Sequence, residues 1–139
     1  MTTRAGVSAA LVSQLDLLAS LAALVGEAVP GGDGQNLLPA LLGEGDTGRD
    51  QLVLEATSRT ALRRGRWLMI PPYAGPPVNT QVDIELGNQP GFQLYDLRKD
   101  IGQQHNLAES LPDTLRQLIS TYTQIRGGDL GKYEELKLE

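Results

Sequence analysis

The sequence predicts an α+β fold in which a small antiparallel sheet of about four strands packs against a C-terminal amphipathic helix. Short runs rich in β-branched and aromatic residues, separated by turn residues, fill most of residues 51–97, which is typical of antiparallel strands. Residues 115–125 instead place apolar side chains three and four positions apart, which is typical of a helix packed on one face. An Ala- and Leu-rich segment precedes these elements, and we expect a buried apolar helix there.

Composition narrows the possible functions of the chain. Its 139 residues suffice for one domain, and 40% hydrophobic and 21% charged residues exclude a disordered chain. The net charge of −5 argues against a nucleic-acid partner, because phosphate contacts favour basic proteins. The sequence has no cysteine and a single histidine, which excludes disulfides, thiolate chemistry and His-rich metal sites.

The first predicted element is a helix from Val7 to Val25, which contains neither proline nor an internal glycine. It is apolar around most of its circumference, as helices buried on several sides are. The rest of the chain is too short to cover it, so we expect exposed apolar surface around Leu11, Leu18 and Leu21. Asp16 and the residues beside it interrupt the run and argue against a membrane span.

A second interpretation of this segment is a signal peptide over residues 1–30. Arg4 would be its charged end and Gly26–Pro30 its cleavage region. Asp16 would then lie inside the apolar core of the signal, which is unfavourable. In the folded helix, Asp16 has a simpler role: a buried carboxylate that hydrogen-bonds a neighbouring element.

The middle of the chain alternates between turn signals and short apolar runs. Pro30–Gly34 is turn sequence, and Asn36–Gly43 predicts a short helix that Gly43 closes. The four prolines of 71–77 predict a loop, and 78–86 an extended arm. Arg64-Gly65 is expected to connect the second and third strands. The strands are expected at 51–57, 60–63, 66–70 and 92–97.

The closing helix has its own start and stop signals. Ser110 is the expected N-cap, Pro112 suits the first turn, and Asp113 stands three residues after the cap. Gly127 ends the helix. Residues 128–139 form the tail, and within it Lys132–Glu139 alternates charge with leucine and is expected to be frayed.

Several motifs occur in a characteristic order along the chain. They are Ser13–Asp16, Asp33-Gly34, Leu37–Gly43, Arg64–Trp67, Leu94–Leu97 with Asp100, and Asn106-Leu107. Together they resemble the C-terminal end of arylsulfatase-like sulfatases, from about Val7 to Ile125. The chain departs from that pattern at Arg66 and Leu68, where the family often has aspartate and lysine.

The resemblance implies an alkaline-phosphatase-like sulfatase in which this chain is the C-terminal subdomain. The family's nucleophile is a formylglycine made within Cys/Ser-x-Pro-x-Arg, and calcium completes its site. This chain has neither a cysteine nor a serine that begins that motif, so we expect no catalytic, cofactor-binding or metal-binding residue in it. Formylglycine and calcium would lie in an upstream catalytic domain, and the intact enzyme would be periplasmic or secreted.

Domain organisation and partners follow from the same resemblance. Residues 1–43 would pack against the N-terminal catalytic domain of the same polypeptide, 44–127 would be the C-terminal subdomain, and 128–139 the tail. The implied substrate is a sulfated small molecule or glycan. The alternative function is a small secreted or periplasmic binding module with a signal peptide at 1–30.

Four residues are candidates for the rim of a substrate cleft: Arg64, Arg66, Trp67 and His105. Arginine's planar fork suits a sulfate oxyanion, and Arg59 and Arg63 add charge nearby. The simpler interpretation is a solvated hairpin with Trp67 in the core and His105 in a structural role. The Gly-rich loops that hold Asp33, Asp46 and Asp50 lack a calcium-loop pattern, so we expect turns there.

Overall fold

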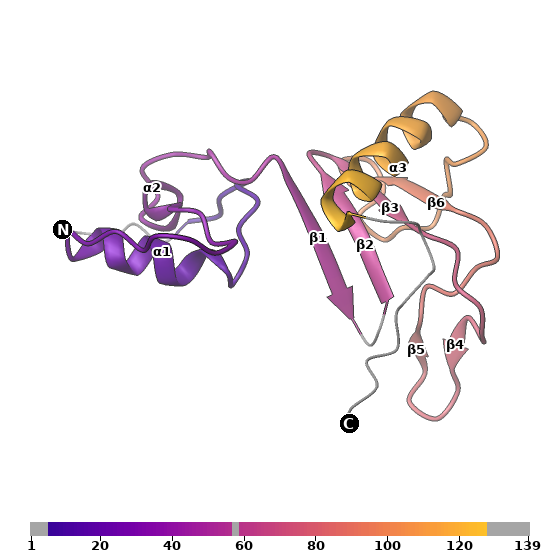
Figure 1. The fold of residues 1–139 in the computed structure, drawn as a ribbon. Helices are drawn as coiled ribbons and strands as arrows, with labels where there is room; N and C mark the ends of the chain where they lie inside the picture. Colours follow the sequence, from indigo (N-terminus) through magenta and orange to yellow (C-terminus); the bar gives the residue numbers. More distant parts are fainter. Residues whose placement is uncertain (1–5, 57–58, 128–139) are drawn as a thin grey trace, which may run out of the picture. The chain divides into compact units, whose positions relative to one another are not determined.

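The computed structural model describes residues 6–56 and 59–127, which form two compact units divided between Leu52 and Val53. The first unit holds α1 (Asp16–Leu24) and α2 (Leu38–Leu41). The second unit holds the β-strands and one long helix (Figure 1). The predicted tail at 128–139 lies outside the described residues.

Helix α1 is shorter than the predicted helix from Val7 to Val25, and that prediction is wrong at its N-terminal half. Residues 7–13 have no regular structure, because they run beside a second segment of backbone. Arg49 N donates to Leu11 O at 2.8 Å, and a Cβ on Gly48 would stand 2.4 Å from Leu11 N. Backbone pairing with residues 48–49 therefore replaces helix in this stretch.

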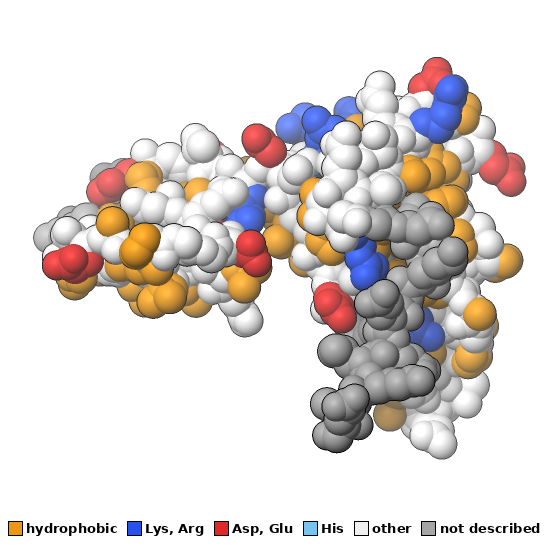
Figure 2. Space-filling view, in the orientation of Figure 1, with side chains coloured by type: hydrophobic (Ala, Val, Ile, Leu, Met, Phe, Trp, Pro, Cys, Tyr) orange, Lys and Arg blue, Asp and Glu red, His pale blue; other side chains and the backbone are white. Residues whose placement is uncertain are grey.

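Helix α1 buries a polar face and exposes an apolar one. Asp16 and Ser20 are fully buried, whereas Leu18 and Leu21 are 67% and 55% exposed. The prediction of a helix buried on several sides is therefore wrong within this chain. The expected exposure of Leu18 and Leu21 is confirmed, while Leu11 is half-buried. Figure 2 shows hydrophobic side chains gathered along this helix.

Loops around α1 satisfy its buried polar face. Leu37 N donates to Ser20 Oγ at 2.9 Å, which ties the start of α2 to α1. Gly43 closes α2 with a φ of +72°, as its sequence predicts.

The four-stranded sheet confirms the predicted antiparallel sheet. Its order is β1-β2-β3-β6, with Leu62 opposite Met69 and Met69 opposite Leu94. The 78–86 arm folds into a separate two-stranded hairpin of β4 (Val78–Asn79) and β5 (Ile84–Glu85). The main sheet consists of β1 (Gln51–Ala56), β2 (Arg59–Arg64), β3 (Trp67–Ile70) and β6 (Gln93–Asp96).

The β2–β3 turn differs by one residue from the predicted Arg64-Gly65 connection. Arg64 pairs with Trp67, so Gly65 and Arg66 form the turn. Gly65 has a φ of +55°, the positive value required at the first position of a tight hairpin turn.

Helix α3 (Pro112–Arg126) covers one face of the sheet (Figure 1). The core between them consists of Leu62, Met69, Leu94, Leu118 and Tyr122. Within it, Tyr122 is hydrogen-bonded to Thr60, and Thr60 N donates to the Tyr73 hydroxyl at 2.7 Å. Buried hydroxyls are thus paired with one another, as the low-polarity interior requires.

The ends of α3 follow the prediction only in part. Pro112 begins the helix and Gly127 ends it with a φ of +68°. The N-cap is Leu111 without a side-chain cap bond, so the prediction that Ser110 caps the helix is wrong. Asp113 pairs with Arg116 one turn along. Among the described residues, no helix has the length and apolar character that crossing a membrane requires.

Candidate functional site

The β2–β3 turn carries the arginine–tryptophan pair that the sequence singles out. The Arg66 guanidinium carbon lies 4.4 Å from the centre of the Trp67 ring, within the range of a cation–π contact. Arg66 Nε is 3.5 Å from Asp96 Oδ2. The Arg66 side chain is 41% exposed while that of Asp96 is 4% exposed, so the carboxylate supports the arginine from below and leaves part of its fork in solvent.

The neighbouring arginines point to opposite faces of the sheet, because successive side chains along a strand alternate. Arg64 Nη1 donates to Thr121 Oγ1 of α3 at 3.1 Å. The Nε atom of Arg63 is buried and has no hydrogen-bond partner in the described part of the chain. Figure 2 shows Lys and Arg side chains gathered near the β2–β3 end of the unit.

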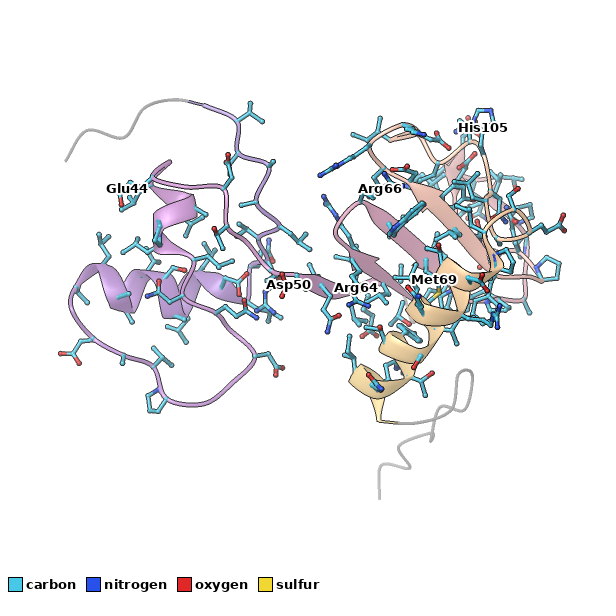
Figure 3. All side chains as sticks on the ribbon, turned by 90° about the horizontal axis from the view of Figure 1, so that it is seen from above. Glu44, Asp50, Arg64, Arg66, Met69 and His105 are labelled. Carbon is cyan, nitrogen blue, oxygen red and sulfur yellow. The ribbon has the colours of Figure 1, made fainter. Side chains whose placement is uncertain are left out.

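His105 lies on the loop that follows β6, apart from Arg64 and Arg66 in Figure 3. Its side chain is 83% exposed, and Nδ1 is 3.6 Å from Asp100 Oδ2. The same oxygen accepts the His105 backbone N–H at 2.8 Å. Backbone N–H groups of Gln104 and His105 lower the pKa of Asp100. The structure therefore joins Arg66 with Trp67 and places His105 in a separate loop.

The resemblance implies calcium in an upstream catalytic domain and none in this chain. Across residues 6–56 and 59–127, no three His, Cys, Asp or Glu side chains come together where they could hold a metal ion.

Sequence reasoning missed the best-formed charged site, which lies in the first unit. Arg49 Nε donates to both oxygens of Asp16 at 2.9 Å, and the two side chains are 9% and 0% exposed. Asp16 also accepts the backbone N–H groups of Ser13 at 2.8 Å and Gln35 at 2.9 Å. This confirms the expected structural role of Asp16. Its partner, 33 residues away, had no local signal.

The bond from Arg49 is the largest cause that lowers the pKa of Asp16, to about 2. The backbone donors Gln35 and Ser13 act in the same direction, and burial opposes them. Asp16 in turn raises the pKa of Arg49. The pair is therefore ionised across the whole physiological range and serves to hold loops, not to transfer protons.

Two known proteins with similar sequences are sulfatases. The chain is 38% identical over 121 residues to an N-acetylgalactosamine-6-O-sulfatase of Bacteroides thetaiotaomicron, an alignment that covers 84% of this chain. It is 33% identical to human arylsulfatase A, over 87% of this chain. The chain is therefore similar to sulfatases over most of its own length.

The similarity is confined to part of those proteins. This chain spans 24% of the length of the Bacteroides sulfatase and 27% of arylsulfatase A. A solved structure from work on glycosaminoglycan metabolism by Bacteroides thetaiotaomicron matches 87% of the chain with a TM-score of 0.79 and 34% identity, and 26% of that structure is covered. No family model matches the chain. These matches confirm the resemblance to the C-terminal region of arylsulfatase-like sulfatases.

Proposed function

We propose that this chain is the C-terminal accessory portion of an enzyme that hydrolyses sulfate esters, and that it is inactive by itself. The observation that carries the proposal is the similarity to two sulfatases over at least 84% of this chain but at most 27% of either relative. A segment of that size supplies a minor part of the relatives' structure.

The sequence supports inactivity of the separate chain. It has no cysteine, and Ser110 is followed by proline two positions later but by Thr114 where the formylglycine motif requires arginine. In this proposal, formylglycine and calcium belong to an N-terminal catalytic domain of the same polypeptide.

Helix α1 is the proposed contact with that catalytic domain. Its buried face is polar, because Asp16 and Ser20 hydrogen-bond the loops beside it. The leucines on its other face are therefore available for packing against another domain. Leu18 and Leu21 expose more than half of their surface, and burial of such side chains contributes about 1.5–3 kcal/mol each. Residues 1–43 would thus provide the docking segment and 44–127 the C-terminal subdomain.

Arg66 and Trp67 are the proposed rim residues for a sulfated small molecule or glycan, because the half-exposed guanidinium retains donors for an oxyanion. Arg64 would add charge beside them. His105 is the weakest of the four candidates, since it lies in a different loop with Asp100 as its neighbour.

The contacts within the first unit argue against the alternative of a cleaved signal peptide at 1–30. Removal of those residues would take away all of α1, and with it the hydrogen-bond partners of Gln35, Leu37 and Arg49. Residues 31–50 would then lose most of the contacts that hold them in the first unit.

Two measurements test the proposal. The first is the mass of the native product in its source cells, detected with an antibody to residues 110–126. A species several times heavier than 15.0 kDa is expected, and a species near that mass would contradict the accessory role. The second is release of sulfate from N-acetylgalactosamine 6-O-sulfate and from an aryl sulfate. The 139-residue chain should release none, and turnover by the purified chain would refute its inactivity.

The rim assignment needs a matched pair of variants in the complete enzyme. Arg66→Ala should raise KM about tenfold or more, as loss of a charge-assisted hydrogen bond does. Arg116→Ala removes an exposed arginine of α3 that forms an ion pair with exposed Asp113 and should leave KM unchanged. Equal effects of the two substitutions would remove Arg66 from the substrate rim.

A further inference from the structure

A cavity of about 230 Å³ lies in the second unit, between β6, the β4–β5 hairpin and the loop after β6. Among the described residues, neither lysine nor arginine contributes to its lining, and Glu85 is the one charged lining residue. Six of its lining side chains are carboxamides: Asn88, Gln89, Gln93, Gln103, Gln104 and Asn106. This concentration of uncharged hydrogen-bonding groups sets the cavity apart from the arginine-bearing turn.

The deepest amides are fixed in place. Gln93 is 2% exposed, donates through Nε2 to Gly87 O at 2.7 Å and accepts the Tyr95 hydroxyl at 2.8 Å. Burial, together with the charges of Asp100 and Glu85, raises the pKa of Tyr95, so this hydroxyl keeps its proton and remains a donor. Asn88 donates to Pro76 O at 2.7 Å. The floor of the cavity is therefore rigid.

The outer amides keep hydrogen-bonding capacity for a ligand. Gln89 and Gln103 have no side-chain hydrogen bond to any described residue, and Gln104 uses Nε2 on Gly102 O at 2.6 Å but keeps its Oε1 acceptor. Gln103 has a φ of +55°, which is strained for a residue other than glycine. Strained residues concentrate at ligand-binding sites.

A second cavity of about 380 Å³ adjoins the first, and the two share Asn88 and Gln89 in their linings. Its other walls include Pro72, Tyr73 and Pro90, and no charged residue is among its described lining. The Arg59 guanidinium contacts two of these walls, with its carbon 5.8 Å from the centre of the Tyr73 ring and its Nε bonded to Asn88 Oδ1. Such tyrosine and proline rings can pack against the C–H faces of a sugar, whereas carboxamides can hydrogen-bond its hydroxyl groups.

We propose that the amide-lined cavity binds one uncharged, hydroxyl-bearing sugar ring of a glycan, and that the next ring lies over Tyr73 and Pro72. A carboxamide offers both donors and an acceptor. It therefore matches sugar hydroxyls, which also both donate and accept hydrogen bonds. A sulfate group is disfavoured in the first cavity, because its described lining includes the Glu85 carboxylate and no cation, while the nearby Arg59 is bonded to Asn88 Oδ1. The volume lies below the ~300–1,000 Å³ of drug-sized sites, which fits a single ring. This binding requires no hydrolysis and goes beyond the proposed function.

The test is titration of the isotope-labelled 139-residue chain with N-acetylgalactosamine, its 6-O-sulfate and inorganic sulfate, followed by NMR of the side-chain amides. The neutral sugar at millimolar concentration should shift the amide signals of Gln89, Gln103 and Gln104. Inorganic sulfate should neither shift them nor displace the sugar, and the 6-O-sulfate should bind no more tightly than the neutral sugar.

Paired variants make the result specific. Gln103→Ala with Gln104→Ala should weaken binding about tenfold, the loss of roughly two neutral hydrogen bonds. Gln117→Ala with Gln124→Ala removes two exposed amides of α3 and should change nothing, and both variants keep a folded spectrum because these side chains are exposed. Absence of shifts with the neutral sugar, competition by inorganic sulfate, or equal affinity of the two variants would each overturn the proposal. None of those outcomes bears on sulfate ester hydrolysis by the complete enzyme.

Discussion

Asp16 organises the first unit because its carboxylate joins three separate stretches of backbone. It accepts hydrogen bonds from Ser13, Gln35 and Arg49, and Arg49 in turn donates to Asp33 O. Among the unit's described residues, few apolar side chains are buried, with Leu37 and Ala40 the ones below a tenth exposed. Its stability therefore depends on this ion pair to an unusual degree.

At the residue scale, Asp16→Asn should destabilise the first unit by about 3 kcal/mol, because Arg49 would stay buried without its anion. Hydrogen exchange of the Gln35 and Leu37 amides measures the effect directly. The control is Asp113→Asn, which breaks an exposed pair on α3 and should cost less than about 0.5 kcal/mol. Equal protection of Gln35 in wild type and Asp16→Asn would contradict this role.

The pKa of Asp16 also predicts an acid limit for the same unit. It falls from 3.8 to about 2 on folding, so the unfolded chain binds the proton more readily. The ion pair stabilises fully above about pH 4, and its contribution falls as the pH drops toward 2. Exchange of the Gln35 amide should accelerate over that interval in wild type, beyond the intrinsic pH effect. In Asp16→Asn the additional acceleration should disappear.

At the scale of elements, the irregular segment 7–13 depends on a glycine. A Cβ at Gly48 would meet Leu11 N at 2.4 Å and Leu11 O at 2.6 Å, closer than real contacts allow. The adjacent Arg49 N–H bonds Leu11 O. Glycine at this position permits the two backbones to pair, and the pairing in turn positions Arg49 for Asp16.

Gly48→Ala should therefore destabilise the first unit by about 1–3 kcal/mol, the usual cost of overpacking. Gly45→Ala is a matched control, since nothing lies within 4 Å of its added Cβ. Thermal unfolding followed by one-dimensional NMR of the α1 leucine methyl groups would compare the two. A Gly48→Ala protein as stable as Gly45→Ala would show that the close approach is relaxed at no cost.

Sequence periodicity predicted the elements that depend on neighbouring residues in the chain. The strands of the sheet and the apolar face of α3 follow from periodicity, and Gly65 ensured a turn, although either neighbour could complete it. The extent of α1 could not be predicted in this way, because Ala and Leu favour helix at residues 7–13 and only backbone pairing with residues 48–49 overrides them. The Asp16–Arg49 pair and the amide-lined cavity were equally hidden, since both gather residues from distant positions.

At the scale of the whole molecule, exposed leucines on α1 coexist with a net charge of −5. Charge repulsion of this size keeps small proteins apart, but a contiguous apolar face promotes association. We expect the isolated chain to self-associate through α1, and more strongly as salt screens the charge.

Leu18→Glu with Leu21→Glu should shift the chain toward monomer in sedimentation velocity, with little loss of folding because both side chains are exposed. Ile101→Glu is the control: it is 84% exposed but lies on a loop of the second unit, and it should leave the association unchanged. A wild-type chain that sediments as a monomer at high salt would contradict this use of α1.

The spacing of Asp16 and Arg49 also sets the order of events during synthesis. Ribosomes add roughly 5–20 residues per second, and Arg49 follows Asp16 by 33 residues. For roughly two to seven seconds, the nascent α1 therefore has its carboxylate unpaired. In the complete polypeptide proposed above, the catalytic domain is synthesised first, so the α1 leucines can dock on it before Arg49 arrives and the first unit closes.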